Sequence, residues 1–131
     1  MHFVGTAVEV RAFHIMPDVE GPEGELHSHD YRIEVDVKRE RLDERGMVCD
    51  LDVLDAALAA TAETVRDRNL EIIRPPDMIA VTVEVFARWA YDQIVAALSD
   101  VDDGQLTVRI WESAEAYGGY QGPTGTATNR C

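Results

Sequence analysis

The sequence predicts a single α+β domain, in which an antiparallel sheet of four strands is covered on one face by two helices. Two observations predict this class. Stretches of alternating polar and apolar residues, typical of strands, occur as one pair near the N-terminus and a second pair near the C-terminus. Between these pairs lie two stretches whose apolar residues recur every three or four positions, as in amphipathic helices. The expected element order is therefore ββααββ.

The first two strands are expected at residues 3–13 and 27–39, joined by a loop rich in proline and glycine. In the second strand, four apolar residues alternate with four charged ones, which indicates one buried and one solvated face. Its apolar positions are Tyr31, Ile33, Val35 and Val37. In the first strand, Val8, Val10 and Ala12 share one parity. The loop is short enough for these strands to pair antiparallel.

Strand parity places three histidines on the buried face at one end of this pair. His27 and His29 continue the apolar parity of the second strand, and His14 follows the first strand on its apolar parity. Side chains at i and i+2 of a strand point the same way, so they can reach one ion. Three neutral imidazoles with an open fourth position are the ligands of a catalytic zinc site, although copper, iron or nickel also accept them. The alternative is three separate histidines bonded to the backbone.

Two helices are expected between the strand pairs. The first begins after Asp50, whose carboxylate can accept hydrogen bonds from the first turn. Its apolar stripe is Leu54, Ala57, Leu58, Thr61, Ala62 and Val65. Pro75 and Pro76 exclude helix from the connection. The second helix begins after Thr82, with Glu84 in its first turn, where the helix dipole favours a carboxylate. Its apolar stripe is Val83, Phe86, Ala87, Ala90, Ile94, Ala97 and Leu98.

The third strand alternates through Leu106, Val108 and Ile110, and a fourth is expected at residues 116–121. The apolar parity of the third strand reaches Glu112, so this carboxylate is expected to point inward. Because an unpaired buried carboxylate is costly, Glu112 needs a partner. It can pair with an arginine, such as Arg109 or Arg11. Its two oxygens also match the N–H edge of a pterin or guanine ring.

Composition indicates one domain at residues 1–121, followed by a flexible tail at residues 122–131. No apolar run approaches the about 20 residues of a membrane helix, so no membrane association is expected. The N-terminus lacks a basic region followed by an apolar one, which favours a cytoplasmic location. Twelve Lys+Arg against 25 Asp+Glu give a net charge of −13, which opposes binding to nucleic acid.

Four motifs in order resemble those of the 6-pyruvoyl-tetrahydropterin synthase family, which includes the bacterial 6-carboxy-tetrahydropterin synthase. They are Phe13-His14, His27-Ser28-His29-Asp30-Tyr31, Thr82-Val83-Glu84-Val85-Phe86-Ala87 and Trp111-Glu112-Ser113. The resemblance covers the chain from Val4 to Gln121. It implies the tunnelling fold, whose subunits join sheet edges into rings and assemble as a homohexamer of two stacked trimers.

The resemblance also implies roles for the candidate site residues. The three histidines would hold Zn²⁺, which in the family binds the side-chain oxygens of 7,8-dihydroneopterin triphosphate. Glu112 would hold the N–H edge of the pterin, and Thr82 and Glu84 would assist it.

The residues that transfer protons in the family are replaced in this chain. The family has a catalytic cysteine a few residues before the His-x-His motif, but residues 22–26 here read Pro-Glu-Gly-Glu-Leu. Glu23 is the best positional substitute, with Glu25 next. A related subgroup with a glutamate there is associated with cleaving the side chain to 6-hydroxymethyl-dihydropterin. A glutamate whose pKa is raised toward neutrality can act as a general base; otherwise both are solvated loop carboxylates.

The family's Leu-Asp-His segment corresponds to residues 65–70, in which Asp67 can supply the aspartate, while Arg68 or Asp67 occupies the place of the histidine. Arg66, Arg68 and Arg74 can contact a phosphate tail or balance nearby carboxylates. The sequence therefore predicts a zinc-dependent lyase acting on a reduced pterin, in which Glu23 and Asp67 move protons. The alternatives are a non-catalytic paralogue that binds a pterin or a metal, and an enzyme for a different purine-like substrate.

Overall fold

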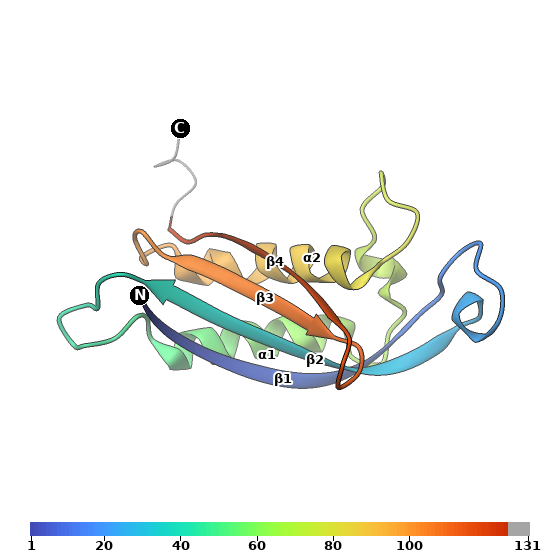
Figure 1. Cartoon of the computed structure of the whole chain (residues 1–131), viewed down its shortest axis with the longest axis horizontal. Helices are drawn as coiled ribbons and strands as arrows, with labels where there is room; N and C mark the ends of the chain where they lie inside the picture. Colours follow the sequence, from blue (N-terminus) through green and yellow to red (C-terminus); the bar gives the residue numbers. More distant parts are fainter. Residues whose placement is uncertain (126–131) are drawn as a thin grey trace.

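The computed structural model describes residues 1–125, which form a four-stranded antiparallel sheet with both helices on one face (Figure 1). The strands are β1 (His2–His14), β2 (His27–Arg39), β3 (Gln105–Trp111) and β4 (Tyr117–Pro123). The helices are α1 (Leu51–Val65) and α2 (Val83–Val95), and short 3₁₀ turns occur at η1 (Pro22–Gly24), η2 (Leu70–Ile73) and η3 (Ala96–Leu98). The sheet order is β1-β2-β3-β4. The predicted fold class and element order are confirmed.

The pairing of β1 with β2 extends beyond the end of β3. β1 and β2 pair along their whole lengths, from His2 opposite Arg39 to His14 opposite His27. β3 pairs with β2 only from Arg32 onward, so the first residues of β2 contact β1 alone. This two-stranded extension carries all three candidate ligand histidines.

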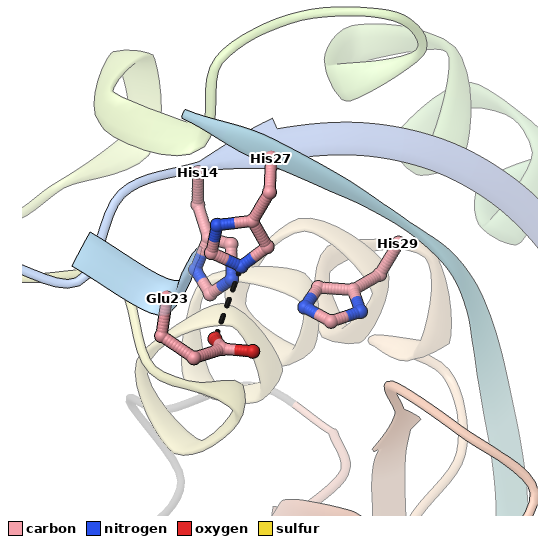
Figure 2. Close-up of side chains that lie close together, drawn as sticks. All are labelled: His14, Glu23, His27 and His29. Atoms are coloured by element: carbon pink, nitrogen blue, oxygen red, sulfur yellow. Dashed lines mark ion pairs between the residues drawn. The ribbon is translucent and has the colours of Figure 1, made fainter. Parts of the chain in front are cut away.

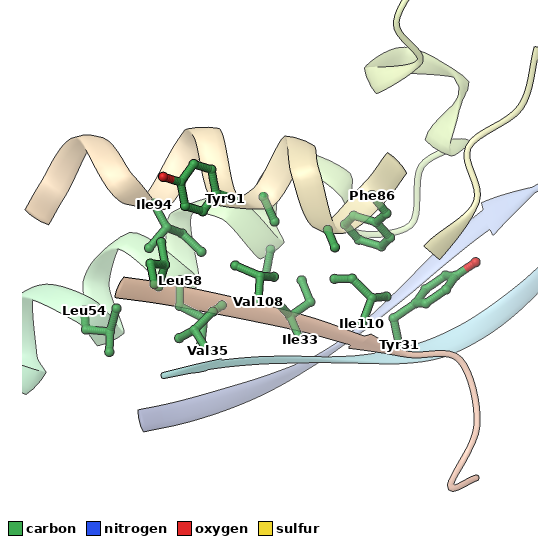
Figure 3. Packing of buried hydrophobic residues seen from close by; sticks show 14 of the residues in the cluster. Tyr31, Ile33, Val35, Leu54, Leu58, Phe86, Tyr91, Ile94, Val108 and Ile110 are labelled. Carbon is green, nitrogen blue, oxygen red and sulfur yellow. The ribbon is translucent and has the colours of Figure 1, made fainter. Parts of the chain in front are cut away.

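The predicted strand parity is confirmed in the core. Tyr31 is 1% exposed, and Ile33, Val35 and Val37 are fully buried. Figure 3 shows Tyr31, Ile33 and Val35 facing α1 and α2. From these helices Leu54, Leu58, Phe86 and Ile94 enter the same core. Burial of this apolar area, at roughly 25 cal/mol per Å², is the main force that stabilises the fold.

Both predicted helix starts are confirmed. The Asp50 carboxylate accepts a hydrogen bond from the Asp52 amide at 2.9 Å. The Thr82 hydroxyl accepts one from the Val85 amide at 3.2 Å. Each cap fixes where its helix begins and therefore which residues face the sheet. No helix in the described part of the chain is long and apolar enough to cross a membrane.

β4 ends later than predicted. Gly122 and Pro123 belong to the strand, and Thr124 is fully buried, with its hydroxyl donating to the Val101 carbonyl at 2.6 Å. A Cβ at Gly122 would lie 2.6 Å from the Tyr91 hydroxyl of α2, so glycine permits this close packing. Gly122, predicted to begin the tail, is therefore needed within the sheet. The rest of the predicted tail, residues 126–131, lies outside the described residues.

Candidate metal centre and ligand site

Three histidines and one glutamate converge where β1 ends and β2 begins (Figure 2). We call His14, Glu23, His27 and His29 the histidine–glutamate cluster. The ring centroid of His14 lies 4.4 Å from that of His27 and 5.2 Å from that of His29. One ligand atom from each of the four residues lies within 4.8 Å of the others, so the cluster could hold a metal ion. The structure thus brings the predicted ligands together with Glu23.

Four ring nitrogens of the cluster are buried without well-formed hydrogen bonds. They are both ring nitrogens of His14 and the Nε2 atoms of His27 and His29. Buried polar atoms in proteins nearly always have a hydrogen-bond partner. Nitrogens that face one another and lack such a partner fit a shared cation.

The backbone orients His27 for such a role. Its Nδ1 lies 2.7 Å from the Glu25 carbonyl oxygen. A carbonyl can only accept, so Nδ1 carries the proton and Nε2 presents its lone pair to the cluster. A carbonyl that holds the outer ring nitrogen in this way is the usual support of a metal-binding histidine. Imidazole nitrogens and a carboxylate are ligands that suit zinc.

Burial also keeps His14 in its neutral form. Burial lowers the pKa of His14 below its ordinary 6.5, and the neighbouring His27 and His29 lower it further. The Val81 backbone and the Glu23 carboxylate act in the opposite direction without cancelling this. A neutral imidazole keeps the lone pair that a metal requires.

We expect the metal-free protein to become less stable as the pH falls below about 6.5. In that range His14 binds a proton in the unfolded chain but resists it in the folded one. Unfolding then takes up protons, so the free energy of unfolding decreases as the pH is lowered. Urea unfolding in chelator at several pH values should show a shallower pH dependence for His14→Gln. Identical dependence in both proteins would exclude His14 as the responsible group.

The loop between β1 and β2 holds Glu23 beside the histidines. The Met16 amide donates to the Glu23 carbonyl at 2.9 Å, and the Gly24 amide donates to Gly21 at 3.0 Å. A Cβ at Gly24 would lie 1.9 Å from the Val19 carbonyl oxygen. Only glycine lets the two sides of the loop approach this closely.

Gly24→Ala is expected to displace this loop and to destabilise the protein by about 1–3 kcal/mol, as overpacking does. The added methyl would meet backbone, which cannot rotate away, so Glu23 must move with the loop. Urea unfolding measures the cost, and zinc affinity reports on the cluster. Glu25→Ala in the same loop is the control, because this side chain is exposed. Wild-type behaviour of Gly24→Ala would show that the loop has room to adapt.

Glu112 directly follows β3 and is half-buried. Both arginines considered as its partners bind other carboxylates: Arg109 binds Asp36 at 2.9 Å, and Arg11 binds Asp67 at 2.8 Å. Glu112 lies close enough to Tyr31 to raise the pKa of that phenol, although burial is the larger cause. Its carboxylate therefore belongs to the same end of the domain as the histidines.

The Val81 backbone lies close enough to His14 to oppose the lowering of its pKa by burial. Val81 directly precedes Thr82, so the start of α2 lies at this end of the domain as well. The Thr82 oxygen accepts from the Val85 amide, which leaves its O–H free to donate to a ligand. Glu84 is exposed and lies against β4, where a Cβ at Gly118 would be 3.5 Å from its Oε1.

Tyr31, predicted from sequence only as a core residue, also lies at this site. Its ring centroid lies 5.4 Å from that of His29 and 6.2 Å from that of His14. The signal was available in the sequence, because Tyr31 follows His29 by two positions and so shares its face.

The model of the family described as 6-pyruvoyl tetrahydropterin synthase matches residues 5–123. This chain belongs to that family. The synthase of Caenorhabditis elegans is 21% identical, with 92% of this chain and 95% of that one covered and a TM-score of 0.69. A Plasmodium falciparum synthase is 12% identical, with 92% and 98% covered and a TM-score of 0.73. A variant of the Plasmodium vivax synthase is 11% identical, with 94% and 99% covered and a TM-score of 0.70.

These structures confirm the tunnelling fold predicted from the resemblance to the tetrahydropterin synthases. At such identities they support the fold alone. Comparison with curated protein sequences gives no match.

Asp67, predicted to be the counterpart of the synthase family's aspartate, is not brought to the histidines of its own chain. Its carboxylate pairs with Arg11, and both side chains are more than half exposed. Arg11 has the opposite parity to His14 on β1, so it points to the other face of the sheet. The Asp67 amide also donates to the Arg11 carbonyl at 2.8 Å, which fixes Asp67 beside this strand.

The arginines near Asp67 mostly balance neighbouring carboxylates. Arg66 pairs with Glu63 at 2.7 Å, and Arg74 pairs with Glu71. These ion pairs agree with the second of the two predicted roles, in which the arginines balance nearby carboxylates rather than contact a phosphate tail.

Proposed function

We propose that this protein is a zinc-dependent lyase that acts on a reduced pterin such as 7,8-dihydroneopterin triphosphate. The observation that carries the proposal is the convergence of three imidazoles, with orphaned buried nitrogens, on one glutamate in a chain of the tetrahydropterin synthase family. Zinc held by His14, His27 and His29 would polarise the hydroxyl oxygens of the substrate's side chain.

Glu23 is the general base in this proposal. Its side chain is 56% exposed, so its carboxylate stands between the histidines and the solvent from which substrate arrives. Glu23 takes the proton of a side-chain hydroxyl, and the electron pair left on that oxygen forms a carbonyl as the adjacent carbon–carbon bond breaks. The same carboxyl group can then return the proton to the carbon that was released. Support for a catalytic glutamate comes from the Plasmodium vivax synthase, in which a glutamate is a catalytic residue.

Glu112 holds the pterin ring. Its two oxygens accept from the ring N–H and the amino group, which gives both affinity and orientation. Glu112 is half-buried, and its hydrogen bonds to a ligand are therefore stronger than at an open surface. The Thr82 hydroxyl donates a further hydrogen bond, and Glu84 lies at the rim.

The subunits are proposed to assemble as a homohexamer of two stacked trimers in the cytoplasm. β1 and β4 are the two edges of the sheet, and an exposed edge strand is a hazard that assembly removes. Asp67 lies beside β1, so in this arrangement it would serve the site of a neighbouring subunit.

Purified protein loaded with zinc is expected to convert 7,8-dihydroneopterin triphosphate to a product of lower side-chain mass, detected by mass spectrometry. Glu23→Gln should lower kcat by about 10²–10⁴-fold, the usual contribution of a positioned base. Glu25→Gln removes the same charge two residues away and should keep wild-type turnover. Tight pterin binding without turnover in any of the three proteins would instead identify a non-catalytic member of the family.

A further inference from the structure

We propose that Glu23 is also the fourth ligand of the metal in the substrate-free protein, and that it leaves the metal when substrate binds. This inference rests on the proposed function and gives Glu23 a second role at the same site. Glu23 would then close the site at rest and act as the base only once it has been displaced.

The spacing of the ligand atoms supports this role. Glu23 Oε2 lies 3.1 Å from His27 Nε2. Two donors that share a tetrahedral zinc at about 2.0–2.1 Å are roughly 3.3 Å apart. The carboxylate oxygen therefore already stands at nearly the distance from His27 that a common metal ion requires. One carboxylate oxygen of Glu23 also belongs to the group whose ligand atoms all lie within 4.8 Å of one another.

The contact between Glu23 and a neutral His27 is not an ordinary hydrogen bond. His27 Nδ1 is committed to the Glu25 carbonyl, so Nε2 faces Glu23 with a lone pair against a lone pair. Nε2 is accordingly among the buried nitrogens without a well-formed hydrogen bond. A doubly protonated His27 would satisfy this one contact. It would leave the orphaned nitrogens of His14 and His29 unexplained, whereas one cation satisfies all of them.

Backbone contacts of the loop, which do not involve the carboxylate, hold Glu23 beside the histidines. The Glu23 carbonyl accepts from the Met16 amide, and the close approach at Gly24 fixes the turn. The side chain can therefore exchange partners while the backbone stays in place. Figure 2 shows the carboxylate reaching toward the three rings from the side opposite their own strands.

This arrangement gives the substrate a defined entry. The histidines approach from β1 and β2 and are at most partly exposed, while the Glu23 side chain is 56% exposed. The carboxylate is thus the ligand that an incoming hydroxyl oxygen can most readily replace. In this exchange one oxygen–metal bond breaks, another forms, and no electrons are transferred. The released carboxylate then lies beside the hydroxyl whose proton it must take.

Zinc affinity of the full chain tests the ligand role without any turnover. Metal-free wild type, Glu23→Ala and Glu25→Ala would be titrated with zinc against a chromophoric chelator. Glu23→Ala should bind zinc more weakly by at least the about 10–100-fold that loss of an outer-shell partner costs. Glu25→Ala should bind like wild type, because its carbonyl still supports His27.

Cobalt-substituted protein gives a second readout, since the visible absorption of Co²⁺ reports on its ligands. The spectrum of wild type should differ from that of Glu23→Ala without ligand. Addition of 7,8-dihydroneopterin should make the two spectra converge, because the carboxylate has then left the metal. Spectra that agree before the pterin is added would overturn the ligand role.

The outcomes separate this inference from the proposed function. Equal zinc affinity in all three proteins overturns the ligand role, and a loss of turnover in Glu23→Gln would still support the base. Weaker affinity in Glu23→Ala with normal turnover in Glu23→Gln supports the ligand and overturns the base. Equal weakening in both alanine variants indicates a general effect of charge and overturns the ligand role.

Discussion

Replacing His14 by alanine is expected to abolish stable zinc binding and, with it, any lyase activity. His14 is 6% exposed, and both of its ring nitrogens are buried without a well-formed hydrogen bond. It faces His27 across the strand pair, so it supplies the ligand from β1 that β2 cannot provide. The loss of affinity should exceed the about 10–100-fold cost of an outer-shell change. Competition with a chromophoric chelator measures it.

His2→Ala is the matched control, because His2 lies at the other end of the same strand. Its ring contacts the Glu40 carbonyl at 3.2 Å and is exposed. His2→Ala should bind zinc like wild type. Thermal unfolding of both metal-free variants checks that the sheet is retained. Wild-type affinity in His14→Ala would remove the proposed metal centre and the mechanism built on it.

The histidines could be located from sequence because strand parity is a local property. His27 and His29 precede an unbroken alternation of apolar and charged residues, and His14 continues a weaker one. A period of two fixes the face of each side chain without knowledge of the rest of the fold. The helix caps at Asp50 and Thr82 were predictable for the same reason, because a cap depends on its own first turn.

Contacts between distant segments were not predictable in this way. The position of Glu23 depends on the Met16 amide and on the close approach at Gly24, neither of which has a periodic signal. Asp67 is predicted to be catalytic from its place in a motif, and the fold places it beside β1 with a φ of 55° and a partner in Arg11. Motif position identifies a residue type, whereas the turn after α1 decides where its carboxylate lies.

The histidine–glutamate cluster packs directly against the core. The Tyr31 ring packs edge-on against Phe86 of α2, with ring centroids 5.3 Å apart, and on its other side against His29. Because interiors are close-packed, a change at Phe86 is transmitted to the floor of the site. Stability and metal binding are therefore expected to share this contact.

Phe86→Ala is expected to lower the free energy of unfolding by about 3–5 kcal/mol, the usual cost of deleting a buried phenyl ring. Phe86, on α2, is fully buried and packs against Tyr31 of the sheet, so its removal leaves a cavity beside that ring. Domains of this kind are stable by only about 5–15 kcal/mol, so this single change removes a large share of the total. Urea unfolding of the metal-free protein measures it directly.

Ile79→Ala serves as the control, because it also truncates a large apolar side chain to alanine, but at a position that is 79% exposed. Its effect should stay within about 0.5 kcal/mol, as for most surface changes. If Tyr31 relaxes into the space left by Phe86, the cost will fall below the expected range and His29 will move with the phenol. Zinc affinity would then drop in Phe86→Ala but not in Ile79→Ala. A small loss of stability with unchanged zinc affinity would show that the core and the metal centre are independent.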